Sequence, residues 1–462
     1  MLSYVDDFSL TVASNSYRSN VRRLQGLFRT LTTRGDRLEV KFSVPKAELI
    51  HWRTPSQRSP LSQAPIALDG LIFRPAGVVR WLGYWLSPPL NSQHHFAHRV
   101  SLAQASFSFV KRLSSPGAGV RPFLNHRIAQ GLLLPILTYG SHLLVPNSHS
   151  LGAMNSFWHR VCRWVTNCFF STPTSILTRE ACLPPIAAYC RYRKRLAALR
   201  IACAPPTHNP AAARLPASFP SLSIFRAQDS SRHLTKGLTS VYLPLDWRSA
   251  APSPPIRKHL PIDAMAHLVL PIIGGLSRLP MVLHAPPPAG TDIPPPQLMM
   301  RTYLALKKRA RDALMDNWGT LHPTPDYYPY SPRLTPHPFM GLDKFVAGRI
   351  HQMRAGKSYL AAHPSWWNEL PNDTCPRCGS EPESFAHAIL HCPEKNRERS
   401  LLLGEVTSLD EGSPLWSSGP LIQALGPFIM ATHTGFPPEM GPRSPGSPSS
   451  PVPSAPPSPA DA

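Results

Sequence analysis

Acidic side chains are scarce in this 462-residue chain, which has 26 Asp and Glu against 48 Lys and Arg. Between Gly70 and Pro205, 15 basic residues accompany a single acid, Glu180. A folded surface normally mixes charges of both signs, so a segment of one sign indicates a polyanionic partner such as nucleic acid. An unusually basic helical domain without such a partner is the alternative.

Long apolar runs are absent as well. The longest stretches, such as Leu132–Leu137, fall far short of the roughly 18 residues that a membrane span needs, so no membrane partner is expected. Asp6 and Asp7 interrupt the one candidate stretch for a signal peptide. The eight cysteines lack the spacings of secreted disulfide frameworks. These absences predict an intracellular protein, either nuclear or cytoplasmic.

The motif Tyr4-Val5-Asp6-Asp7 places two adjacent carboxylates between short β-type segments. The pattern predicts a strand, a tight turn and a second strand, with the acids at the tip. Hard divalent cations prefer such oxygen ligands, and paired Mg²⁺ or Mn²⁺ ions drive nucleotidyl transfer. For an isolated Asp-Asp pair, a solvated turn is the alternative interpretation.

Three further segments follow in order: Phe42–Ile50, which contains Lys-Ala-Glu-Leu, Trp81–Trp85, which reads Trp-Leu-Gly-Tyr-Trp, and Pro135–Gly140, which reads Pro-Ile-Leu-Thr-Tyr-Gly. Together with the Tyr-Val-Asp-Asp motif, they resemble in order and spacing the reverse transcriptases of non-LTR (LINE-type) retrotransposons, especially fungal ones. The resemblance implies a strand at Phe42–Ile50, around Lys46, and a hairpin at Trp81–Trp85 that grips the primer strand. The resemblance implies an RNA-directed DNA polymerase. Its partners would be RNA and DNA, as template–primer and as target DNA.

The resemblance also implies roles for single residues. Asp6 would bind the catalytic Mg²⁺ or Mn²⁺, Asp7 would support it, and Lys46 would act near the incoming nucleotide. The primer or nucleotide side would be lined by Tyr4, Val5, Trp81, Leu82 and Gly83. In that family the fingers and another metal-binding Asp lie upstream, whereas here Met1 stands three residues before Tyr4.

We therefore expect a carboxy-terminal fragment of such an enzyme that does not extend a primer alone. Two alternatives stay open. One is a non-catalytic RNA- or DNA-binding protein that keeps the later domains, and the other is a non-functional transposon relic.

Helical periodicity follows the hairpin motifs. It predicts helices over Tyr17–Thr33 with Ser16 as its cap, from Phe96 to Val110, Phe123–Leu134, Leu151–Val165, Pro185–Cys203, Arg301–Asn317 and Leu342–Ala355. The helix that ends at Cys203 interleaves Tyr189 and Tyr192 with a basic set, Arg191, Arg193, Lys194, Arg195 and Arg200. Such a set can bind a nucleic-acid backbone and stack on bases, while a solvated helix face is the alternative.

A second sharp motif begins at Cys375-Pro-Arg-Cys378-Gly and continues to His387 and Cys392. A C-x₂-C turn and a short helix over Glu383–His391 would each supply two ligands, which makes a closed, tetrahedral, structural Zn²⁺ site. His391 lies one turn after His387 and is the rival fourth ligand. The pattern also resembles the zinc-binding module that ends many non-LTR reverse transcriptases.

The predicted fold class is α+β. We expect a partial reverse-transcriptase palm of short antiparallel strands plus a helix (1–90), a helical thumb (91–205), a Pro-rich linker (206–300), a helical region (301–432) that carries the small zinc module at about 366–400, and a disordered Pro/Ser-rich tail (433–462). The 56 prolines of the chain support the linker and the tail, since such segments cannot bury enough apolar surface to order themselves.

Overall fold

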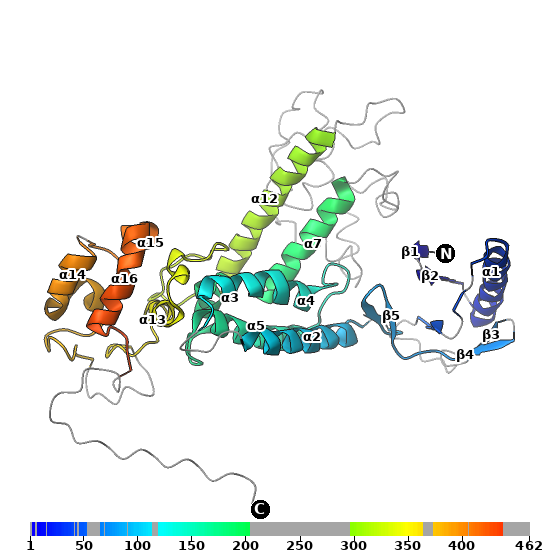
Figure 1. Ribbon diagram of the computed structural model, residues 1–462. Coiled ribbons are helices and arrows are strands. Elements are labelled where there is room, and N and C mark those ends of the chain that lie inside the picture. Colours follow the sequence, from blue (N-terminus) through cyan, green and yellow to red (C-terminus); the bar gives the residue numbers. More distant parts are fainter. Residues whose placement is uncertain are drawn as a thin grey trace, which may run out of the picture. The chain divides into compact units, whose positions relative to one another are not determined.

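The computed structural model consists of helices and short β-hairpins (Figure 1). It describes residues 2–4, 7–14, 16–40, 42–43, 46–52, 65–68, 70–89, 91–112, 119–203, 296–363, 373–404 and 406–437. Its contacts define a first unit, Met1–Ala105 with Pro135–Phe157 and Tyr189–Arg311, and a second unit, Ser106–Leu134 with Trp158–Ala188 and Asp312–Ala462. Most of the predicted linker and tail lies outside the described residues.

The strands form three two-stranded antiparallel sheets in the described part of the chain. They pair β1 (Leu2–Tyr4) with β2 (Asp7–Ser9), β3 (Ile66–Leu68) with β4 (Leu71–Phe73), and β5 (Val79–Trp81) with β6 (Tyr84–Leu86). In the first hairpin Tyr4 lies opposite Asp7, so the two predicted strands and their antiparallel pairing are confirmed. Val5 and Asp6 lie outside the described residues. Mixed helices and small antiparallel strands agree with the α+β expectation at that level.

The first helix confirms the cap read from the sequence. Helix α1 spans Tyr17–Arg37, and the hydroxyl of Ser16 accepts a hydrogen bond from the N–H of Ser19 at 3.2 Å. This bond satisfies one of the donors that the first helical turn leaves without a partner. Farther along the helix, Gln25 donates to the carbonyl of Ala67 at 3.0 Å, which ties α1 to β3.

The prediction of a strand around Lys46 is wrong for the described residues of this segment. The Lys46 N–H donates to the Ser43 carbonyl in a turn, and Leu49 makes only an isolated parallel bridge to Pro75. Pro45, directly before Lys46, has no N–H to contribute to a ladder, which favours the turn. Lys46 itself is exposed.

The four helices predicted between Phe96 and Cys203 are confirmed, the second with a π-helical turn inside it, and a further short helix, α6 (Thr174–Glu180), was not predicted. The series comprises α2 (Gln93–Lys111), α3 (Pro122–Ile128), the π-helical turn η3 (Ala129–Leu133), α4 (Leu134–Thr138), α5 (Ser148–Thr166), α6 and α7 (Ile186–Cys203). The π-helical turn ends two residues before Pro135, which has no N–H to donate to the carbonyl one turn earlier. No helix in the described ranges combines the length and apolar character needed to cross a membrane.

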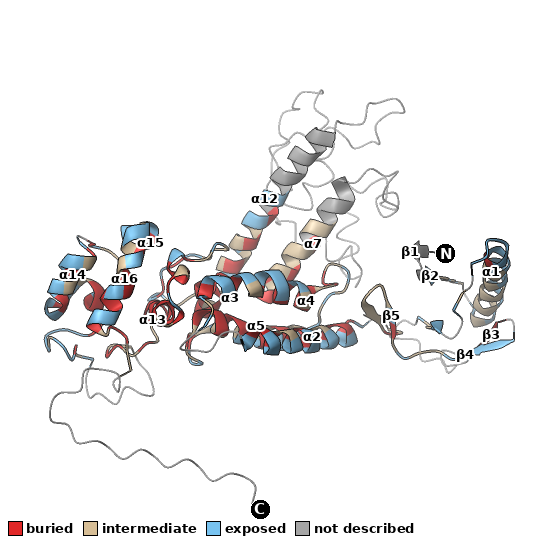
Figure 2. Ribbon diagram, viewed as in Figure 1, coloured by how far each residue is buried: buried red, intermediate tan, exposed pale blue. Residues whose placement is uncertain are grey.

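The later part of the chain is also helical. It contains α12 (Pro296–Leu321), the 3-10 turn η5 (Pro338–Gly341), α13 (Lys344–Arg354), the π-helical turn η6 (His387–His391), the 3-10 turn η7 (Pro393–Lys395), α14 (Asn396–Leu402), α15 (Pro414–Ser417) and α16 (Gly419–Thr432). In the second unit, Trp158, Trp318, Phe339 and Phe428 are fully buried and mark the core. Figure 2 shows the buried residues of α13 in red.

Glu180, the single acid between Gly70 and Pro205, is fully buried in the second unit. Its carboxylate accepts hydrogen bonds from Tyr328 Oη at 2.6 Å, His351 Nδ1 at 2.6 Å and Arg354 Nε at 3.1 Å. Burial alone would raise the pKa of Glu180, but the charge of Arg354 and the hydrogen bond from His351 outweigh it and hold the pKa well below its usual range. The network joins α6 to α13 and to the loop that contains Tyr328.

Replacement of Glu180 should destabilise this unit strongly. In Glu180→Gln the shape is kept, but the buried Arg354 charge loses its counterion, so we expect a loss of about 3–5 kcal/mol in the free energy of unfolding. A lowered carboxyl pKa stabilises the fold at pH values above the unfolded pKa of about 4.3, and this stabilisation is lost as the pH falls further. Urea unfolding at several pH values measures both effects. In the variant, the free energy of unfolding should be lower at neutral pH and should fall less steeply as the pH is lowered into the acid range.

The matched control is Asp312→Asn, which removes an exposed carboxylate on α12 of the same unit. It should change the stability by less than about 0.5 kcal/mol. Equal effects of the two substitutions would show that the Glu180 network contributes nothing specific.

Candidate metal centre and nucleic-acid interface

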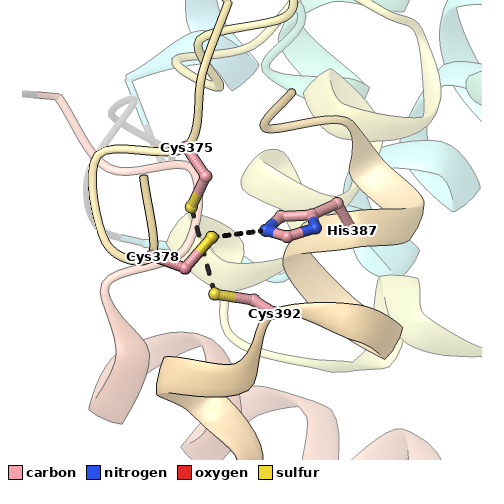
Figure 3. A group of neighbouring side chains, drawn as sticks. All are labelled: Cys375, Cys378, His387 and Cys392. Atoms are coloured by element: carbon pink, nitrogen blue, oxygen red, sulfur yellow. Dashed lines mark hydrogen bonds between the residues drawn. The ribbon is translucent and has the colours of Figure 1, made fainter. Parts of the chain in front are cut away.

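Three thiols and one imidazole converge in the second unit (Figure 3). The ligand atoms of Cys375, Cys378, His387 and Cys392 all lie within 4.8 Å of one another. Cys375 Sγ is 3.9 Å from Cys392 Sγ, and Cys378 Sγ is 3.3 Å from His387 Nε2. A tetrahedron with metal–sulfur bonds of about 2.3 Å has edges of roughly 3.8 Å, so this spacing fits a single ion. The cluster could therefore bind a metal such as zinc.

Local backbone structure explains the convergence. The Cys375 N–H donates to the backbone carbonyl of Glu381 at 2.7 Å, and the Gly379 N–H donates to the backbone carbonyl of Cys375 at 2.8 Å. These bonds close a tight turn around the first two thiols. Gly379 has φ 69°, a left-handed value that glycine adopts without strain. Arg399 then holds the other pair of ligands, because its guanidinium donates to the carbonyls of Ile389 at 2.9 Å and Cys392 at 2.6 Å.

The electrostatics of the cluster favour a cation. Burial and the neighbouring Cys375 raise the pKa of the Cys392 thiol to about 11. Hydrogen bonds from Ser380 lower the pKa of Cys378 to about 6. Several thiolates in one small site repel one another, so a bound divalent ion is what would hold them all deprotonated. The donor set of three sulfurs and one imidazole suits Zn²⁺.

Glu381 orients the imidazole of the cluster and was missed in the sequence. His387 Nδ1 lies 2.9 Å from Glu381 Oε2, so the imidazole donates there and leaves Nε2 facing Cys378. A carboxylate on the far nitrogen is the usual device that fixes the tautomer of a metal-binding histidine. His391 is exposed and does not belong to the cluster, so the geometry selects His387 over its rival.

In the first unit, two of the motifs from the sequence contact each other. The turn between β5 and β6 has φ 47° at Leu82 and φ 77° at Gly83, as a type I′ hairpin requires. Tyr139 Oη donates to the Leu82 carbonyl at 2.8 Å, and Arg99 Nη2 donates to the Gly83 carbonyl at 3.1 Å. The Arg99 guanidinium also lies 4.0 Å from the centre of the Tyr139 ring.

His95 completes the support of this hairpin. The Trp85 N–H donates to His95 Nδ1 at 3.3 Å, so the partners assign the proton to Nε2, which donates to the Tyr139 carbonyl at 2.8 Å. Burial lowers the pKa of His95 and keeps this neutral form. A Cβ at Gly140 would lie 2.6 Å from His95 Nε2, which explains the glycine at that position.

The remaining predicted site residues are only partly described. The backbones of Tyr4 and Asp7 lie in the β1–β2 hairpin, while their side chains lie outside the described residues, as do those of Arg195 and Arg200 on α7. On the same helix Arg191 and Arg193 are half-buried and Lys194 is buried, and burial lowers the pKa of Lys194. Of these three basic residues, the two arginines are therefore the more accessible. Trp81 is half-buried beside the hairpin turn.

Comparisons with models of protein families, with curated proteins and with solved structures found no match to this chain.

The metal centre can be tested by removing one ligand. Cys378→Ser should lose zinc from the purified full chain, because three remaining ligands cannot close the tetrahedron. Elemental analysis should find about one zinc per unmodified chain and almost none in the variant. His391→Ala should keep its zinc. Zinc that survives in Cys378→Ser, or disappears in His391→Ala, would contradict this ligand set.

The role of Glu381 predicts a smaller effect. Glu381→Gln should still bind zinc but with roughly tenfold lower affinity, the low end of what such a partner contributes, because this carboxylate is 63% exposed. Competition with a chromophoric chelator measures the affinity. Glu394→Gln removes another carboxylate near the cluster that is not a partner of His387, and it should leave the affinity unchanged.

Proposed function

We propose that this chain carries the Tyr-Val-Asp-Asp, helical and zinc-binding segments of a non-LTR retrotransposon reverse transcriptase and that it holds a template–primer. In the intact enzyme, Asp6 and Asp7 would bind Mg²⁺ or Mn²⁺, and two such ions supply the electrostatic stabilisation for nucleotidyl transfer. Zn²⁺ at the Cys375 cluster would have a structural role, since all four ligand positions come from the protein.

The observation that carries this proposal is the way the β5–β6 turn is supported. Leucine in the left-handed region costs about 1–2 kcal/mol, so Leu82 is an unusual residue for that position. Two consecutive carbonyls of the turn are each held by a side chain, one from Tyr139 and one from Arg99. Strain that the surroundings hold in place is typical of functional sites. The Trp-Leu-Gly motif thus forms a hairpin turn, and Tyr139 of the Thr-Tyr-Gly motif supports it. We assign this supported hairpin to gripping the primer.

Charge supports a nucleic-acid partner. The net charge of the whole chain is +22, and between Gly70 and Pro205 the only acid, Glu180, is neutralised in the interior by Arg354. The surface of this segment therefore presents cations without carboxylates, which favours binding to phosphates by release of counterions.

One observation favours a non-catalytic RNA- or DNA-binding protein as the second candidate. Lys46, expected near the incoming nucleotide, lies in an exposed turn and not in a strand. A protein that had kept the helical part and the metal cluster but lost the catalytic centre would tolerate this change.

The supported hairpin predicts a specific binding defect. Arg99→Met removes the donor to Gly83 and should free the turn, so affinity for an RNA–DNA duplex with a recessed 3′ end should fall about tenfold, because a hydrogen bond from a charged donor contributes about 1.5–3 kcal/mol. Fluorescence anisotropy of labelled duplexes measures the change. Affinity for a blunt duplex of the same length should fall less than threefold.

The control is Lys111→Met, which removes one exposed positive charge from the same helix, α2. It should weaken both duplexes equally and slightly. If Arg99→Met behaves like Lys111→Met, the hairpin does not grip a primer end. If the unmodified chain binds neither duplex at low salt, the whole proposal is wrong.

A further inference from the structure

Phe170 is the most exposed aromatic side chain described, with 88% of its surface accessible. It lies in the loop between α5 and α6, in the second unit. Single exposed apolar side chains are common on protein surfaces, so exposure alone does not mark a site, and the contacts that hold the Phe170 loop and ring decide its role.

The loop around Phe170 is held firmly on both sides. The Asn167 carbonyl accepts a hydrogen bond from Gln352 Nε2 on α13 at 2.7 Å. Phe169 packs edge-on against Tyr359, with ring centres 5.2 Å apart. The Thr172 N–H donates to the Phe169 carbonyl at 3.1 Å, which closes the turn after Phe170. The backbone that presents the exposed ring is therefore fixed by its neighbours.

Arg163, on the last turn of α5, holds the ring itself. Its guanidinium carbon lies 4.9 Å from the centre of the Phe170 ring, and its Nη2 donates to the Phe170 carbonyl at 3.1 Å. Because Arg163 already orders the Phe170 ring, the ring loses little conformational entropy when it binds a partner.

The surroundings of the pair are basic and polar. Helices α5 and α13, which hold the loop, contain no Asp or Glu. The exposed residues that follow Phe170 in this loop, Ser171 and Thr174, are polar, so the loop offers one exposed ring. A protein partner would need a wider apolar surface, whereas one nucleobase needs only one ring and a nearby cation for its phosphate.

We propose that Phe170 and Arg163 form a stacking platform for an unpaired base of single-stranded RNA or DNA. The inference rests on the proposed nucleic-acid function and extends it to a contact outside the primer hairpin. Phe170 stacks on the base, and Arg163 orients the ring and faces the phosphate. Stacking on an aromatic ring tolerates every base, so no sequence preference is expected.

The test compares oligonucleotides with and without bases. Phe170→Ala in the full chain should lower the affinity for a single-stranded dT20 by roughly 5- to 150-fold, the range for loss of one stacked base. Affinity for a 20-mer of abasic sites should stay unchanged, because only phosphate contacts remain. The dependence of the dT20 affinity on salt should keep its slope, since no charge is lost. Phe170→Trp should bind dT20 at least as tightly as the unmodified chain.

The control is Phe109→Ala, which removes another exposed ring, 69% accessible, on α2. It should leave dT20 binding unchanged. Equal losses for Phe109→Ala and Phe170→Ala, or equal losses on dT20 and on the abasic strand, would overturn the proposal. A fall of more than about 4 °C in Tm for Phe170→Ala would also overturn it, because an exposed ring carries no packing.

The experiment separates this inference from the function on which it rests. If the unmodified chain binds neither single strand nor duplex, the nucleic-acid function itself fails. If it binds the recessed duplex normally and Phe170→Ala has no effect on dT20, the platform alone is wrong.

Discussion

The buried carboxylate of Glu180 is the constraint on which the second unit depends. Arg354 and His351 donate to it from helix α13, and Tyr328 donates from the loop between α12 and η5. A buried guanidinium without a counterion is costly, so the packing of α13 against α6 requires this single acid. In a chain with 48 basic side chains and 26 acids, few carboxylates are available for that purpose. The scarcity of acids thus limits the number of buried ion pairs that the chain can form.

The metal cluster depends on the same network through its aromatic neighbours. The Arg354 guanidinium lies 4.9 Å from the Trp416 ring, and Trp416 stacks on Phe385 with ring centres 6.3 Å apart. Phe385 stands two residues before His387, a ligand of the cluster. A chain of ring contacts therefore links Arg354 on α13 to the segment that carries His387. For this reason the cluster and the network are best treated as parts of one folded unit, and not as a separate small module.

Local patterns carried most of what the sequence predicted correctly. The Ser16 cap, the hairpin at Asp7 and the spacing from Cys375 to Cys392 each involve residues within about two dozen positions, so chain geometry alone limits the outcome. Contacts between distant positions escaped prediction. The support of Leu82 by Tyr139 joins residues 57 positions apart, and no periodicity encodes it. At Lys46 the resemblance implied a strand, whereas the described residues there form a turn and one isolated bridge, and the preceding proline has no N–H for a ladder.

Exposure is the other property that a sequence does not show. The interleaved tyrosines and basic residues of α7 suggested a nucleic-acid surface, yet Lys194 is buried there. Phe169 and Phe170 are adjacent in the sequence, but the Phe169 ring packs on Tyr359 while the Phe170 ring is exposed to solvent. Which of two neighbours faces outward is decided by the contacts of Asn167 and Thr172 at the ends of the loop. A candidate binding residue is therefore identified by two properties together: backbone hydrogen bonds that fix its loop, and a side chain that stays exposed. Composition alone does not separate these cases.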